Sequence, residues 1–94
     1  MTLSSKHRRT LADVYARPTP AGIKWARIEA LVVALGGAVT QRAGSRIAFA
    51  LNGVDAVFHS PHPSPDASRP AVRSFAAFLT AAGVRIERGS ALLP

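Results

Sequence analysis

The sequence predicts an α+β domain of two layers, in which two helices cover one face of a three-stranded antiparallel sheet. Three observations support this class: an apolar helical periodicity over residues 24–35, the dipeptide Asn52–Gly53 between two apolar runs, and a second helical periodicity after Ser68. With 94 residues, of which 48% are hydrophobic, the chain has enough apolar material for one such core.

An additional helical arm is expected in front of this domain. Ser4–Ser5 can cap a helix that runs to about Ala16, and Pro18 prevents its continuation. The segment has few apolar residues and carries the basic run KHRR, so we interpret it as an appended arm that docking would order. Its basic residues are expected to face solvent; the alternative is that they add non-specific affinity for a nucleic-acid backbone. The expected organisation is an arm at residues 1–21, a core at residues 22–86 and a loose tail at residues 87–94.

Two helices belong to the core. The first is expected at about residues 24–35, where Gly36–Gly37 ends it. The second follows a cap at Ser68, with Pro70 in its first turn, and ends at Gly83. Between the sheet and this last helix, the run HSPHPSPDASRP is broken by prolines and is expected to form an irregular connector.

The three strands are expected at residues 38–42, 45–51 and 54–59. Asn52–Gly53 favours a two-residue type I′ turn, and this turn fixes the register of the last two strands. Phe49 then faces Ala56 on the buried side, while Arg46 faces His59 on the open side. The apolar residues expected on the buried side are Ile47, Phe49, Leu51, Val54 and Phe58.

The chain is strongly basic, with 12 lysines and arginines against 5 acidic residues and a net charge of +7. Small domains of this kind usually bind nucleic acid or an acidic protein; the alternative is an arginine-rich protein without such a partner. The absence of cysteine excludes disulfides, and the histidines and acids show no ligand spacing, so neither a metal nor another cofactor is expected. No run approaches the roughly 20 apolar residues of a membrane span, so we expect a cytoplasmic protein without membrane contact.

Four stretches resemble, in order and spacing, the HicA family of bacterial toxins: IKWARIEALVVALGG, RAGSRIAFALNG, AVFHSPHP and SRPAVRSFAAFLTAAGV. The resemblance extends from about Ile23 to Val84. It implies a fold similar to that of double-stranded-RNA-binding domains. It also implies metal-independent endoribonuclease activity on mRNA, independent of the ribosome, and neutralisation by a cognate HicB antitoxin.

The resemblance further implies a catalytic histidine just after a Gly-Ser dipeptide in the hairpin strand. Here Gly44–Ser45 is followed by Arg46 and Ile47. Because Ile47 belongs to the buried side, Arg46 occupies the outward position of the family's histidine. Two functions therefore remain open: an mRNA-cleaving toxin with a rearranged site, or a non-catalytic RNA- or protein-binding module on the same fold.

The predicted pairing of Arg46 with His59 gives a hypothesis for catalysis. His59 would act as general acid or base on the ribose 2′-hydroxyl, and Arg46 would hold the phosphate. The alternative is that His59 is an ordinary residue at the end of a strand on a binding face. Contacts with RNA are expected from Lys24, Arg27, Arg42, Ser45, Arg46, His62, Arg69 and Arg73. At Arg69 and Arg73, the start of a helix adds to the attraction of phosphate.

Overall fold

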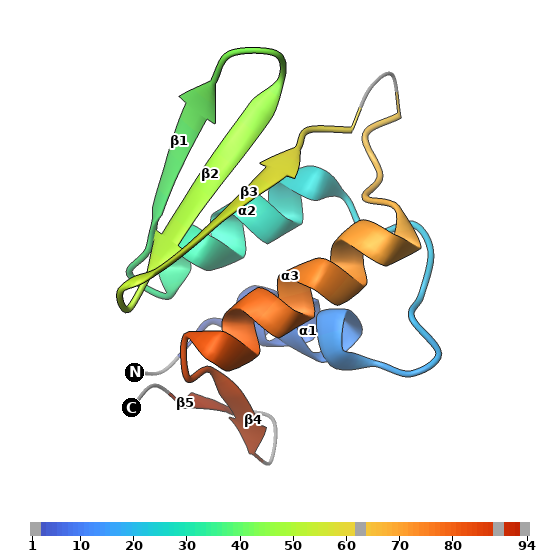
Figure 1. The fold of residues 1–94 in the computed structure, drawn as a ribbon. Coiled ribbons are helices and arrows are strands. Elements are labelled where there is room, and N and C mark those ends of the chain that lie inside the picture. Colours follow the sequence, from blue (N-terminus) through green and yellow to red (C-terminus); the bar gives the residue numbers. More distant parts are fainter. Residues whose placement is uncertain (1–2, 62–63, 88–89, 93–94) are drawn as a thin grey trace.

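The computed structural model describes residues 3–61, 64–87 and 90–92. The helices and strands are α1 (Ser5–Tyr15), α2 (Trp25–Ala34), β1 (Ala38–Arg42), β2 (Arg46–Leu51), β3 (Val54–His59), α3 (Arg69–Ala81), β4 (Arg85–Glu87) and β5 (Ser90–Leu92). Strands β1, β2 and β3 form one antiparallel sheet, and α2 and α3 cover one of its faces (Figure 1). The predicted α+β class is confirmed.

The ends of the helices follow from local chemistry. The Ser4 hydroxyl accepts a hydrogen bond from the backbone N–H of His7, and the Ser68 hydroxyl accepts one from the N–H of Ala71 at 3.2 Å. Helix α2 is followed by Gly36, whose φ of +92° lies in the left-handed region that glycine adopts most easily. Both serine caps and this stop were expected from the sequence, and the structure confirms them.

The turn between β2 and β3 sets the register of the sheet. Asn52 and Gly53 have φ angles of 51° and 79°, which is the backbone of a type I′ turn. The predicted pairs Phe49–Ala56 and Arg46–His59 are both present. The turn is also tied to the end of α3, because the Asn52 side-chain amide donates a hydrogen bond to the carbonyl of Ala82 at 2.8 Å.

The core lies between the sheet and the helices. Phe49, which is fully buried, has its ring centroid 5.7 Å from those of both Trp25 in α2 and Phe75 in α3. The rings of Phe58 and Phe78 complete this aromatic cluster, at 5.3 and 6.1 Å from Phe49. Aromatic pairs at these distances contribute stability beyond that of the apolar area they bury, so the cluster fixes both helices on the sheet.

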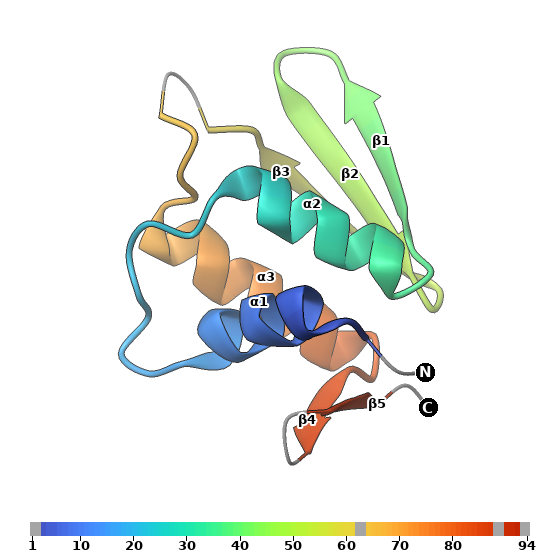
Figure 2. The same ribbon diagram turned by 180° about the vertical axis from the view of Figure 1, so that it is seen from behind.

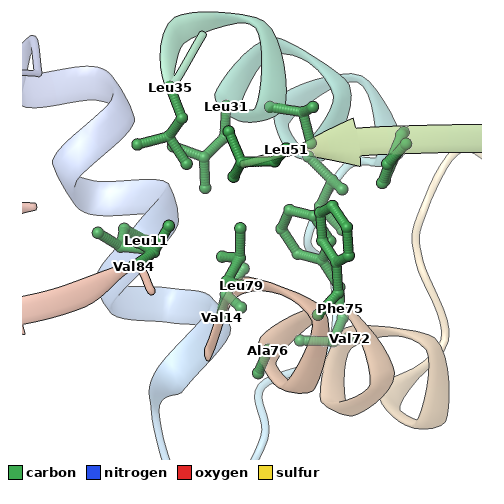
Figure 3. Packing of buried hydrophobic residues seen from close by; sticks show 14 of the residues in the cluster. Leu11, Val14, Leu31, Leu35, Leu51, Val72, Phe75, Ala76, Leu79 and Val84 are labelled. Carbon is green, nitrogen blue, oxygen red and sulfur yellow. The ribbon is translucent and has the colours of Figure 1, made fainter. Parts of the chain in front are cut away.

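Helix α1 packs against both α2 and α3 (Figure 2). Its Leu11 and Val14 are fully buried and belong to the same cluster as Leu79 of α3 (Figure 3). The hydroxyl group of Tyr15 shares a hydrogen bond of 3.0 Å with that of Thr80. The division into an arm at residues 1–21 and a core at residues 22–86 stays an interpretation.

Strands β4 and β5 pair as a small antiparallel hairpin after α3. The sequence indicated only a weak strand tendency around residues 84–86. Of the expected tail at residues 87–94, residues 88, 89, 93 and 94 lie outside the described part. Within the described residues, no helix combines the length and the apolar character that crossing a membrane requires.

Candidate nucleic-acid interface

The outer face of the sheet, turned away from α2 and α3, carries a row of basic side chains. The strand register places Arg42 of β1 beside Arg46 of β2, and Arg46 beside His59 of β3. All three residues are exposed. Like charges directly opposite one another on a sheet repel, so an anion bound across Arg42 and Arg46 would relieve this repulsion. This row (Arg42, Arg46 and His59) is called the basic row.

Apart from Asp55 of β3, the remainder of the outer face carries small or apolar side chains. Next to the basic row lie Thr40, Ala48 and Val57, again side by side across the three strands. Val57 is 55% exposed, although it is a large apolar residue. The outward positions of these three strands hold no aromatic residue on which a base could stack, so the face is suited to contact with a sugar–phosphate backbone.

His59 also lines a cavity of about 560 Å³ at the edge of the sheet. Trp25 at the start of α2, and Ser68 and Arg69 at the start of α3, form other parts of its wall. The Arg69 guanidinium is positioned by a hydrogen bond from its Nε to the carbonyl of Thr19, at 3.1 Å. The cavity therefore brings a histidine, an arginine and the start of a helix to one place, and each can interact with a phosphate group.

A backbone connection closes one side of this cavity. The N–H of Trp25 donates to the carbonyl of Pro65 at 2.9 Å, and the N–H of Ala67 donates to the carbonyl of Ile23 at 2.8 Å. Lys24 and Asp66 lie between these two hydrogen bonds and form an ion pair, with 2.8 Å from Nζ to Oδ1. We call this connection, between residues 23–25 and 65–67, the clasp. It holds the connector after β3 against the start of α2.

The other predicted contact residues are dispersed. Ser45 lies in the turn before β2 with a φ of 63°, and its carbonyl accepts a hydrogen bond from Ser60. Arg73 is exposed on α3 and lies outside the lining of the cavity. His62 lies outside the described residues.

Two of the predicted contacts already have partners within the chain. Lys24 is the cation of the clasp. The Nη2 atom of Arg27 contacts the Asp13 carboxylate of α1 at 2.8 Å, and its Nε atom donates to the hydroxyl of Thr10 at 3.1 Å. Arg27 therefore lies at the contact between α1 and α2, away from the outer face.

Residues 25–88 match the model of the family described as the HicA toxin of bacterial toxin–antitoxin. This match covers more than half of the chain. The chain belongs to the HicA family. Comparisons with curated proteins and with solved structures gave no match.

The HicA match includes the whole sheet, α2, α3 and most of the cavity wall, whereas α1 precedes it. The basic row thus lies in the part of the molecule that defines the family. Sequence reasoning placed Arg46 beside His59, because the turn fixes the register of β2 and β3; it named Arg42 as a contact without placing it beside Arg46. It missed that Trp25 and Ser68 help to form the cavity at His59, since this depends on how the connector folds back.

Proposed function

We propose that this HicA-family toxin binds RNA at the basic row and cleaves it with His59 as the general base. The observation that supports the proposal is the pairing of His59 with Arg46 at the edge of a cavity that Arg69 also lines. In this arrangement an imidazole that can transfer protons lies beside guanidinium groups that can bind phosphate. We further propose that the substrate is mRNA in the cytoplasm and that a HicB-like antitoxin neutralises the toxin.

The chemistry requires one proton acceptor and a cationic environment. His59 would take the proton of a ribose 2′-hydroxyl, and the 2′-oxygen would then bond to the adjacent phosphorus as the bond from phosphorus to the 5′-oxygen breaks. Water supplies the proton that the departing 5′-oxygen needs. The products would be a 2′,3′-cyclic phosphate and a 5′-hydroxyl, and the reaction uses no metal ion.

The arginines would stabilise the negative charge that develops on the phosphate oxygens. Arg46 is held in place because its Nε donates to the carbonyl of Ala43 at 2.9 Å, so its guanidinium keeps a defined position on the outer face. A preorganised cation of this kind lowers the barrier more than one that must be ordered during the reaction. Arg42 and Arg69 would bind the phosphates on either side.

A second function is favoured by one observation: Arg46 stands where the resemblance to the family implies the catalytic histidine. On this alternative, the basic row and the cavity bind RNA without cleaving it, and His59 is one more contact. The two functions share a binding site and differ in whether His59 carries out proton transfer.

Cleavage of a labelled RNA by the purified protein in the presence of EDTA distinguishes these functions. We expect His59→Ala to lower the rate by about 10²- to 10⁴-fold, the usual contribution of a general base, with little change in affinity. Arg46→Ala should lower both the cleavage rate and the affinity for RNA. His7→Ala, which removes a histidine from α1, is the matched control and should cleave like the wild type.

Each outcome of this experiment decides between the two functions. Cleavage by His59→Ala at the rate of the wild type would refute the role of His59. If the wild type binds the RNA without cleaving it, and Arg46→Ala weakens this binding, the non-catalytic function would be established. Growth and intact mRNA in cells that express the same variants provide the corresponding test of toxicity.

A further inference from the structure

A second hollow lies between α1 and α2, away from the cavity at His59. It has a volume of about 450 Å³ and is lined by Ser5, Lys6, Arg9 and Arg27. We call it the basic hollow. Three of its four residues belong to α1, which precedes the part of the chain that matches the HicA family. The proposed RNA cleavage does not use it.

The electrostatics of α1 are unusual at this end. The first turn of a helix favours acidic side chains, because its free N–H groups and the helix dipole are positive there. The first turn of α1 contains no acidic residue, and Lys6 lies in it. Arg9 follows one turn later on the same side of the helix, as the shared hollow requires. A bound anion would offset the resulting repulsion.

Arg27 gives the basic hollow a fixed cation. Its guanidinium is held by Asp13 and Thr10, and its side chain is 28% exposed. Asp13 offsets only one of the three positive charges contributed by Lys6, Arg9 and Arg27. The hollow therefore keeps a net positive charge, and one of its donors is already ordered.

We propose that the basic hollow binds a backbone phosphate of RNA, as a contact separate from the outer face of the sheet. The inference rests on the proposed RNA binding and extends it to a helix that precedes the family match. Guanidinium, ammonium and hydroxyl groups together match the oxygens of a phosphate diester. Among the described residues, none that lines the hollow has an apolar side chain, whereas the centre of a protein–protein interface is rich in them. RNA is therefore favoured over an acidic protein.

The test compares two double variants that lose the same charge. Lys6→Ala with Arg9→Ala empties the basic hollow of its exposed cations, and Arg17→Ala with Arg85→Ala removes two exposed arginines elsewhere. All are made in the full-length chain with His59→Ala, so that the RNA stays intact. The measurement is the affinity for a labelled 20-nucleotide polyuridine at several salt concentrations, with thermal melting as the check on folding.

The change of RNA affinity with salt concentration shows whether a phosphate contact has been lost. Each phosphate neutralised on single-stranded RNA contributes about 0.7 to the slope of log K against log salt, so loss of the one phosphate bound in the hollow should reduce the slope by about 0.7. At about 0.2 M salt the affinity should fall roughly threefold. The control pair should bind like its parent.

The other outcomes would overturn the inference, each in a recognisable way. An equal effect of both pairs would mean that only the net charge matters. No effect of the Lys6 and Arg9 pair would exclude the basic hollow while leaving RNA binding intact. If polyglutamate bound as tightly as the RNA and lost affinity in this pair, the hollow would be a site for an acidic protein. A parent protein that fails to bind RNA would refute the proposed function as well.

Discussion

The close approach of α2 to the sheet makes Gly37 sensitive to the addition of a single methyl group. Gly37 follows α2 and precedes β1. A Cβ atom placed on it would lie 2.6 Å from the carbonyl oxygen of Ala50 and 2.9 Å from a methyl carbon of Val32. Ordinary van der Waals contact begins at 3.4 Å, so the backbone of β2 or of α2 must move for Gly37→Ala to fit.

The cost of this movement can be bounded from the structure. Ala50 is paired with Ala38 on one side and with Asp55 on the other, and Val32 is fully buried, so neither neighbour moves alone. Overpacking of this kind costs typically about 1–3 kcal/mol, and a clash with paired backbone belongs to the upper part of that range. We expect Gly37→Ala to lower the free energy of unfolding by about 2–3 kcal/mol and the melting temperature by roughly 10–20 °C.

Urea denaturation followed by circular dichroism measures the change. Gly53→Ala is the control, because a Cβ atom at Gly53 meets nothing within 4 Å and the φ of +79° alone makes the substitution unfavourable. Its cost should be about 1–2 kcal/mol, from left-handed backbone strain. If Gly37→Ala were no more destabilising than Gly53→Ala, the argument from the close approach would be refuted.

Three further experiments test contacts that join distant segments. Burial raises the pKa of Tyr15 above its usual 10.0, so the folded state favours the protonated phenol. The contribution of Tyr15 to stability should be fully present below about pH 10 and be lost as the pH rises through the folded pKa. Absorbance at 295 nm follows this titration because Tyr15 is the single tyrosine, and Tyr15→Phe should abolish the dependence. Asn52→Gly keeps the left-handed turn but loses the bond to Ala82, so it should cost about 1 kcal/mol in urea denaturation; no loss would mean that the bond is neutral. A double-mutant cycle of Asp13→Ala and Arg27→Ala should give a coupling of about 0.5 kcal/mol that fades with salt, since both side chains are partly exposed; a coupling that persists at 1 M salt would contradict this.

The sheet could be predicted closely because its determinants are local. A two-residue turn allows one register, and side chains alternate between two faces along a strand. Asn52–Gly53 therefore predicted that Arg46 lies beside His59, and that Phe49 faces the helices. The caps at Ser4 and Ser68 were predicted for the same reason, since each acts within three residues of itself.

The remainder depends on contacts between residues that are far apart in the sequence. The spacing of apolar residues indicates that Arg27 lies off the buried stripe of α2, but not that α1 covers that side. Similarly, no pattern near Lys24 indicates a partner 42 residues later at Asp66, because their contact requires the connector to fold back. The cavity at His59 and the basic hollow both arise from such contacts. The sequence predicted His59, Arg69 and Arg27 as site residues, but neither their grouping nor the other residues that line the two hollows.

The clasp joins the connector after β3 to the start of α2, beside the cavity at His59. Its two backbone hydrogen bonds, from Trp25 and from Ala67, join segments that no strand of the sheet includes. Opening of the clasp would therefore break no hydrogen bond of the sheet, and hydrogen exchange at these two amides would measure the free energy of that opening separately from global stability. Since both donors are main-chain groups, a change of side chain leaves them in place and only proline removes one. The two hydrogen bonds of the clasp are thus independent of side-chain identity, whereas its Lys24–Asp66 ion pair is lost when either side chain changes.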